Sequence, residues 1–76
     1  MHTLESAFDA FGTDAEKALL PKVKLYTRLL NLIRLRVKDH ELRSVITADL
    51  NEEFSDAYNA YHSVMKKERD YSNAYY

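Results

Sequence analysis

The sequence predicts an all-α fold, a small bundle of three or four helices in a single domain over residues 1–76. A chain of 76 residues leaves room for one small core, because chains of this size bury only about 60% of their unfolded surface. One Gly and one Pro argue against a β-rich fold, since hairpins and tight turns use both residue types. Hydrophobic residues make up 46% of the chain, which is ordinary for a globular protein and too many for a disordered one.

The first predicted helix spans residues 4–11. Thr3 precedes it and is the predicted N-cap. One apolar face follows from residues at helical spacing, namely Leu4, Ala7, Phe8 and Phe11. Gly12 comes next, at the position where a left-handed residue commonly ends a helix, so we expect that conformation there.

The helical pattern then continues over residues 14–38. Thr13 and Glu16 have the spacing of a capping box, which predicts the start of this stretch. Pro21 interrupts it, because proline lacks a backbone donor and crowds the preceding turn. Either a short helix ends near Leu20 and Pro21 opens a new one, or one long central helix is kinked there. The apolar face keeps its direction across Pro21, which favours the kinked helix.

Residues 22–38 divide on a helical wheel into an apolar half and a polar half. The apolar half contains eight residues, Val23, Leu25, Tyr26, Leu29, Leu30, Leu32, Ile33 and Val37. One neighbouring helix is too narrow to cover half a circumference. We therefore expect a central helix covered by at least two others, and a homodimer would also explain the width of this face.

Two further helices complete the prediction. Asp39 is the predicted N-cap of a short helix whose apolar residues are Leu42, Val45, Ile46 and Leu50. Asn51 is predicted to cap the last helix, because acidic residues follow it where the positive end of the helix dipole favours them. The inner face of that helix is predicted to contain Phe54, Ala57, Tyr58, Tyr61, Val64 and Met65.

Residue types that carry catalysis or bind metals are sparse. The absence of Cys excludes disulfides, thiolate zinc sites and thiol nucleophiles. His2, His40 and His62 are not spaced for joint metal binding, and one Gly cannot build a phosphate-binding loop. We therefore expect no enzymatic activity, no cofactor and no metal.

Charge is divided along the chain although the net charge is −1. Residues 1–16 carry four acidic and no basic side chains, residues 17–43 eight basic and two acidic, and residues 44–76 six acidic and three basic. Lys24, Arg28, Arg34 and Lys38 are predicted to lie along one side of the central helix, as a basic stripe that contacts an acidic protein or phosphates. The acidic ends of the chain and the lack of aromatic residues within the stripe make nucleic acid the weaker alternative.

Two charges interrupt apolar faces. Arg36 lies within the apolar arc of the central helix, and Asp49 lies within that of the next helix. An isolated buried charge costs several kcal/mol, so each needs a partner or solvent. Either Arg36 and Asp49 pair across the turn between their helices, or Arg36 reaches solvent from near its helix end.

Tyrosines are concentrated toward the C-terminus. Tyr58 and Tyr61 are predicted to be core residues whose hydroxyl groups reach the rim. Exposed aromatic residues are enriched in protein interfaces, so Tyr71, Tyr75 and Tyr76 are predicted to contact a partner or a second copy. The alternative is that this tail folds back over the small core.

Part of the chain resembles the haemolysin-expression-modulating (Hha/YmoA) family. The similar segments are Leu32-Ile33-Arg34-Leu35-Arg36, then Leu42 with Val45-Ile46, then Glu53-Phe54-Ser55-Asp56. The resemblance covers about half of the chain and needs gaps, and this chain has additional N-terminal residues. It implies a small all-helical regulator that binds a nucleoid-structuring protein of the H-NS type rather than reading DNA itself.

The sequence also bears on location and role. Its first residues lack the basic and apolar regions of a secretory signal, and the apolar stretch over residues 25–37 contains three arginines and is too short to cross about 30 Å of hydrocarbon. We therefore expect a cytoplasmic protein without a membrane span. The predicted function is non-enzymatic protein binding, by a small regulator, inhibitor or adaptor of bacterial or phage type. The predicted contact residues are Lys24, Arg28, Arg34, Lys38, Tyr71, Tyr75 and Tyr76.

Overall fold

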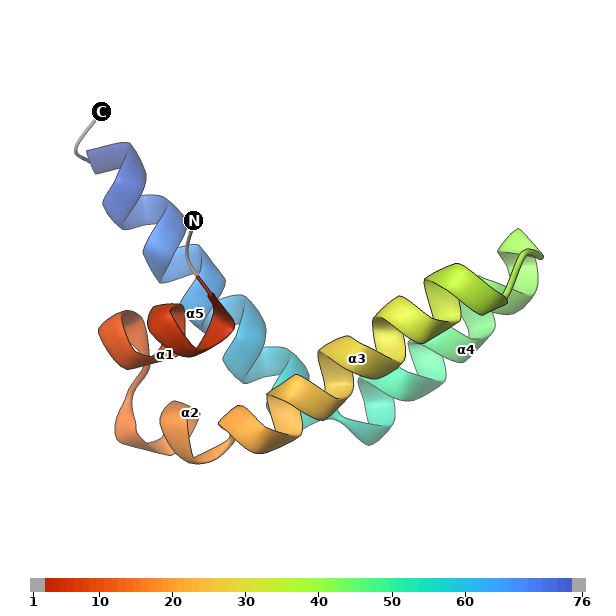
Figure 1. Cartoon of the computed structure of the whole chain (residues 1–76), viewed down its shortest axis with the longest axis horizontal. Helices are drawn as coiled ribbons and strands as arrows, with labels where there is room; N and C mark the ends of the chain where they lie inside the picture. The colour runs from red at the N-terminus through yellow and green to blue at the C-terminus, as the bar shows by residue number, and fades with distance from the viewer. Residues whose placement is uncertain (1–2, 75–76) are drawn as a thin grey trace.

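The computed structural model describes residues 3–74, and the regular structure within that range is entirely helical (Figure 1). The helices are α1 (Leu4–Phe11), α2 (Asp14–Ala18), α3 (Leu20–Arg36), α4 (His40–Glu53) and α5 (Ser55–Ala74). The predicted all-α fold class is confirmed. The described residues form five helices rather than three or four, because the chain also breaks at Leu19, while the predicted break before the last helix falls at Phe54 instead of Asn51.

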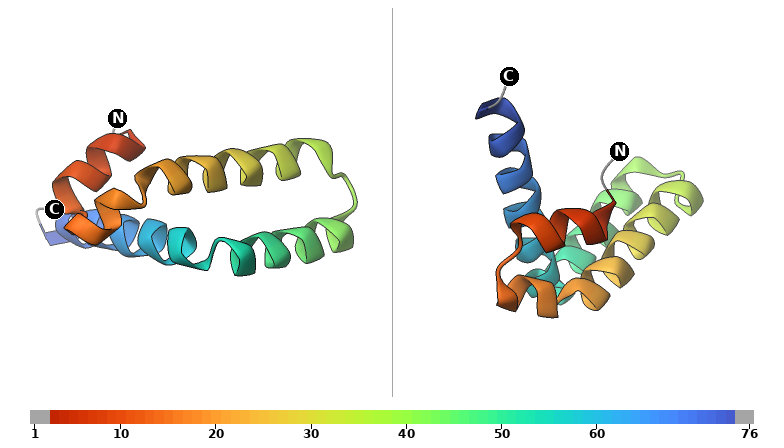
Figure 2. Two further views of the ribbon diagram at one scale, coloured as in Figure 1. Left: turned by 90° about the horizontal axis from the view of Figure 1, so that it is seen from below. Right: turned by 60° about the vertical axis from the view of Figure 1, so that its left-hand side comes forward.

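The molecule has the shape of a V (Figures 1 and 2). Helices α3 and α4 form an antiparallel hairpin that extends away from the rest of the chain. Helix α5 leaves the end of α4 at an angle, and α1 and α2 lie beside α5 and the beginning of α3. The principal dimensions are 40 × 28 × 17 Å. The loop between α3 and α4 is thus the tip of one arm, and α5 is the other arm.

The core lies at one end of the molecule, where α1, α3 and α5 meet. Its buried side chains are Ala7 and Phe8 of α1, Val23 and Tyr26 of α3, and Ala57, Ala60 and Val64 of α5. Helix α4 contributes no fully buried residue. The predicted inner face of the last helix is confirmed for Ala57 and Val64, and Ala60 joins them without having been predicted. The distal part of the hairpin therefore extends beyond the core.

Three predicted helix starts are confirmed by their hydrogen bonds. Thr3 and Asp39 accept a backbone N–H from the first turns of α1 and α4, at 3.1 and 3.0 Å. At the start of α2, the hydroxyl of Thr13 accepts the N–H of Glu16 at 3.1 Å, and the carboxylate of Glu16 accepts the N–H of Thr13 at 2.8 Å. Each cap satisfies donors that would otherwise lack a partner within the helix.

Gly12 ends α1 in an extended conformation, with φ −78° and ψ 144°, and not in the predicted left-handed one. Its N–H donates to the carbonyl of Phe8 at 2.8 Å. A Cβ atom added at Gly12 would lie 2.5 Å from that carbonyl oxygen, which is too close for a side chain. Glycine is needed here because a side chain would collide with the carbonyl one turn earlier, and not because of a positive φ.

Pro21 lies in the first turn of α3, and Leu19 separates this helix from α2. Of the two predicted alternatives, the broken helix is therefore present, and the favoured kinked helix is wrong. Proline is well placed in a first turn because its missing N–H has no partner within the helix there. The apolar face could not decide between the two, since Leu19 at the break and Leu20 at the start of α3 both pack against the same core.

Asn51 lies inside α4 and does not cap the last helix as predicted, because α4 continues to Glu53. The side-chain oxygen of Asn51 accepts a hydrogen bond from the hydroxyl of Tyr26. The side-chain oxygen that would have capped the last helix is therefore bonded to α3 instead. The break falls instead at Phe54, with φ −111° and ψ 36°.

Candidate functional site

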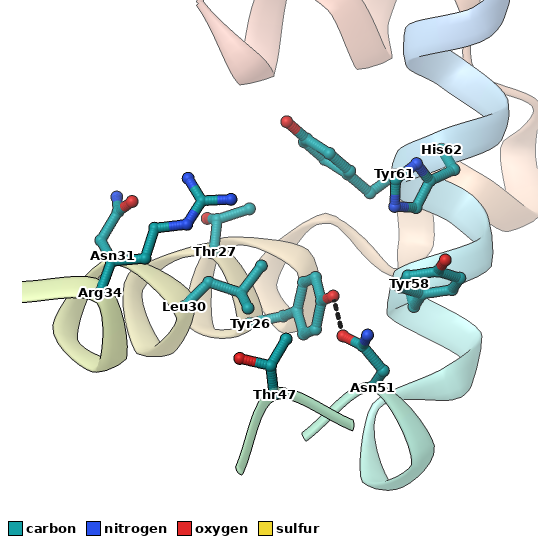
Figure 3. A pocket seen from close by; sticks show the side chains of 10 residues that line it. All are labelled: Tyr26, Thr27, Leu30, Asn31, Arg34, Thr47, Asn51, Tyr58, Tyr61 and His62. Carbon is teal, nitrogen blue, oxygen red and sulfur yellow. Dashed lines mark hydrogen bonds between the residues drawn. The ribbon is translucent and has the colours of Figure 1, made fainter. Parts of the chain in front are cut away.

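A cleft of about 330 Å³ lies in the V between the hairpin and α5 (Figure 3). All three long helices line it. Its principal side chains are Tyr26 and Arg34 of α3, Asn51 of α4, and Tyr58, Tyr61 and His62 of α5. The cleft depends on the angle between α5 and the hairpin, because residues from both arms of the V form its walls.

Aromatic rings form one continuous wall of the cleft. The ring centroids of Tyr58 and His62 are 4.3 Å apart, and those of Tyr61 and His62 are 5.4 Å apart with the planes at 87°. Tyr26 extends this wall to the floor, with its ring 6.3 Å from that of Tyr58 in an edge-to-face arrangement. Such contacts restrict the motion of the rings, so the wall is largely formed before any ligand binds.

The floor of the cleft joins two helices. Tyr26 is buried, and its hydroxyl donates to the side-chain oxygen of Asn51. Burial, reinforced by the neighbouring Tyr58 and Tyr61, raises the pKa of Tyr26 above its ordinary value. The hydroxyl therefore remains a protonated donor at neutral pH, which suits a structural bond between α3 and α4 better than proton transfer.

Arg34 carries the only full positive charge among the described side chains that line the cleft, and none of these side chains is a carboxylate. The side chain of Arg34 is exposed, and none of the three ion pairs found within residues 3–74 involves it. A guanidinium with free donors binds carboxylates in a bidentate manner. The cleft therefore offers an anion-binding group opposite an aromatic wall.

The predicted basic residues do not share one side of α3. Lys24 pairs with the carboxylate of Glu5 in α1, and Lys38 lies in the loop after α3. Arg28 and Arg34 are both exposed but point about 120° apart, because each residue turns the helix by about 100°. The structure thus brings Arg34 alone of these four residues to the cleft.

The predicted tyrosine contacts have different surroundings. Tyr71 remains 54% exposed, but its ring packs 5.4 Å from that of Phe11, so α5 folds against α1 at this point. Tyr75 and Tyr76 lie outside the described residues. Tyr58 and Tyr61 are half-buried and pack against the core, as predicted, and they also face the cleft.

The predicted pairing of Arg36 with Asp49 is wrong. Both side chains are exposed, and no ion pair joins them in the described part of the chain. Arg36 is the last residue of α3, whereas Asp49 lies more than two turns into α4. In an antiparallel hairpin this separates them by roughly 12 Å along the axis, at about 1.5 Å per residue. Arg36 therefore reaches solvent near its helix end, which was the alternative prediction.

The cleft was not predicted from the sequence, although one signal for it is present. Thr27, Asn31 and Arg34 have i, i+4, i+7 spacing and form a polar row beside the apolar face of α3. All three line the cleft. The row alone does not identify a concave site, because the second wall depends on the break at Phe54.

Comparison of the chain with known protein families, with curated proteins and with solved structures found no match. Among residues 3–74, no group of three or more His, Asp or Glu side chains is arranged to hold a metal ion. In the same range, none of the helices combines the length and the apolar character required to cross a bilayer. The geometry and chemistry of the cleft are therefore the basis for assigning a function.

Proposed function

We propose that this protein is a non-enzymatic binding module that receives a segment of another protein in the cleft between α5 and the hairpin. The observation that carries this proposal is the aromatic wall of Tyr58, Tyr61 and His62 together with the exposed guanidinium of Arg34. Tyrosine and arginine are among the residues that contribute most to the energy of protein interfaces. A module of this kind acts as a regulator, inhibitor or adaptor, since binding is its whole activity.

The lining of the cleft indicates the chemistry of the partner. Arg34 favours a carboxylate, and the half-buried faces of Leu30, Tyr58 and Tyr61 favour an apolar or aromatic side chain. A volume of about 330 Å³ is at the low end for a ligand pocket and suits one or two side chains of a partner. A segment with an acidic residue beside a large apolar residue satisfies both walls.

Selection from a random peptide display library tests this proposal. We expect the enriched peptides to carry Asp or Glu next to a large apolar residue. Arg34→Gln and Tyr61→Ala should each weaken the binding of a selected peptide about tenfold or more, because each removes one wall's contribution. Arg69→Gln is the matched control, since Arg69 is an exposed arginine of α5 that does not line the cleft. Equal loss in the control, or no enrichment, would contradict the proposal.

Nucleic acid is the alternative partner, and one observation favours it. Helix α3 carries five basic residues and no acidic one, namely Lys22, Lys24, Arg28, Arg34 and Arg36. Two of these charges are already engaged, because Lys22 pairs with Asp56 at 2.9 Å and Lys24 pairs with Glu5. If the chain binds an oligonucleotide, the logarithm of the binding constant should fall with the logarithm of the salt concentration, with a slope of about −0.9 for each phosphate neutralised, whereas peptide binding in the cleft should depend weakly on salt.

The resemblance to the Hha/YmoA family suggests a more specific partner, a nucleoid-structuring protein of the H-NS type. The acidic–apolar chemistry that suits the cleft would then occur on that partner. Titration of the chain with a protein of that type, compared between the unmodified chain and Arg34→Gln, tests this version directly.

A further inference from the structure

The hairpin has a second face, on the side away from the cleft, where large apolar side chains are exposed. Within residues 3–74, the large apolar side chains classed as exposed are Leu25, Leu32, Leu35, Leu42, Val45 and Tyr71. All but Tyr71 belong to the hairpin, and Leu35 and Val45 are 67% and 59% exposed. Monomeric proteins rarely leave apolar side chains gathered on one surface, so such a surface usually meets a partner.

The positions of these residues follow the pattern of a helix-packing seam. On α3, the half-buried Leu29 lies between the exposed Leu25 and Leu32, at steps of four and three residues, and on α4 the exposed Leu42 and Val45 are three residues apart. Alternating steps of three and four place side chains in one row, as in coiled coils. We call the surface formed by Leu25, Leu29, Leu32, Leu42 and Val45 the outer hairpin face. These residues lie on the opposite side of each helix from Arg34 of α3 and Asn51 of α4, which face the cleft, because each residue turns the helix by about 100°.

Charge is distributed unequally between the two helices of the hairpin. Helix α3 is wholly basic, whereas α4 carries the acidic residues Glu41, Asp49, Glu52 and Glu53 and the single basic residue Arg43. None of the ion pairs within residues 3–74 joins α3 to α4. The outer hairpin face therefore has a basic side on α3 and an acidic side on α4. Among residues 3–74 of a single copy, no ion pair joins these two sides.

The alignment of α3 with α4 determines which of their residues lie at the same height along the axis of the hairpin. The bond between Tyr26 and Asn51 sets one pair of opposite residues, and the helices run antiparallel from there (Figure 2). Each step forward along α3 therefore corresponds to one step back along α4. The pairs at equal level are Arg28 with Asp49, Leu32 with Val45, Leu35 with Leu42, and Arg36 with Glu41.

A second copy of the chain fits this face. A two-fold axis parallel to the hairpin keeps every level and lays α3 of one copy on α4 of the other. Leu32 of one copy then lies opposite Val45 of the other, and Arg28 of one copy lies opposite Asp49 of the other. Apolar side chains therefore face apolar side chains, and cations face carboxylates. An axis across the hairpin would instead lay α3 on α3, where like charges repel.

We propose that the outer hairpin face is a homodimer interface, at which two hairpins associate into an antiparallel four-helix bundle. The cleft remains open in both copies, so the proposal does not depend on the proposed function. Two helices of this length provide an interface at the low end of the usual size range, so we expect a reversible dimer rather than a permanent one.

Sedimentation equilibrium from micromolar to millimolar concentration, with the charge variants Arg28→Glu and Asp49→Arg, tests the proposal. We expect the unmodified chain to show a monomer–dimer equilibrium, and each variant alone to dimerise at least about tenfold more weakly because like charges then meet at both symmetric contacts. An equimolar mixture of the two variants should form heterodimers. The heterodimer contains two symmetric contacts between positions 28 and 49. At the first contact, the glutamate of one variant meets the arginine of the other. At the second contact, the unchanged Asp49 of the first copy meets the unchanged Arg28 of the second. Both contacts are therefore attractive again.

Arg34→Glu is the matched control, because it makes the same charge change on α3 but on the cleft side. It should leave the dimerisation constant unchanged, and circular dichroism should show the same helix content in every variant, since all three positions are exposed. A chain that stays monomeric at millimolar concentration would overturn the proposal, as would a mixture that associates no better than its components. Peptide binding by Arg28→Glu reports separately on the proposed function and should be unchanged.

Discussion

Glu16 connects a local helix cap to the tertiary structure. One oxygen of its carboxylate accepts the N–H of Thr13 at 2.8 Å and the ammonium of Lys67, from α5, at 2.9 Å. These hydrogen bonds, with a further one from Ser63, lower the pKa of Glu16 to about 2. The same ammonium also lies 3.4 Å from the carbonyl of Phe11. The connection between α1 and α2 is thus held against α5 by one carboxylate and one lysine.

Substituting Glu16→Gln should therefore destabilise the fold in a pH-dependent way. Because the pKa of Glu16 is lower in the folded state than in the unfolded state, its ionised carboxylate stabilises the fold at pH values above the unfolded pKa of 4.5. This stabilisation is lost as the pH falls toward 2. We expect a loss of about 1 kcal/mol at pH 7, since the partner lysine is partly exposed, and almost no loss near pH 2. Urea unfolding across this range measures it. The exposed Glu41→Gln is the control, and an equal loss at pH 2 and pH 7 would contradict the assignment.

Single residues differ in how far the sequence alone could place them. The caps at Thr3, Thr13 and Asp39 were predicted correctly, because each depends on groups within four residues of the cap. Gly12 and Asn51 were not. At Gly12 the local pattern predicts that the helix ends but does not distinguish a left-handed from an extended conformation, and Asn51 bonds to the hydroxyl of Tyr26, which is distant in the sequence.

Helices α4 and α5 show that the sequence pattern is also limited in predicting which face of a whole helix is buried. Both have apolar residues at helical spacing, but α5 buries Ala57, Ala60 and Val64 whereas α4 buries no residue completely. The small side chains of Ala57 and Ala60 let α1 and α3 approach α5 closely. A hydrophobic pattern predicts that a face exists, but it does not show whether that face meets the protein's own core or a different surface.

A matched pair of valine substitutions tests this difference between the two helices. Val64→Ala should lower the free energy of unfolding by about 2 kcal/mol, because it leaves a cavity beside a fully buried side chain. Val45→Ala should change it by less than about 0.5 kcal/mol when measured at a concentration that keeps the chain monomeric. Urea denaturation followed by circular dichroism provides both values. Similar losses at the two positions would mean that the distal hairpin packs more tightly than the structure shows.

The whole molecule is asymmetric, with its core at one end and a two-helix arm at the other (Figure 1). The sequence predicted the helical class and most of the core, because these follow from composition and periodicity. It did not predict the V, because the angle between α4 and α5 arises from one residue, Phe54, whose conformation interrupts an otherwise continuous helical pattern. The cleft depends on that angle, which is why it was not predicted as a site. The outer hairpin face does not depend on it, and the wide apolar face of residues 22–38 already suggested a homodimer.

This asymmetry predicts two classes of backbone amides in hydrogen exchange. At low micromolar concentration, amides near Val23 and Val64 should exchange only through global unfolding, because they belong to the core. Amides at the end of α3 and the start of α4 should exchange much faster, since local opening of the tip exposes almost no buried side chain. Raising the concentration should slow exchange selectively at the tip, because dimerisation through the outer hairpin face adds packing there. The Arg28→Glu variant should lose this concentration dependence but keep the slowly exchanging amides of the core. Uniform protection along α4 and α5 at low concentration would contradict the prediction, because it would show that the hairpin and the core unfold as one unit.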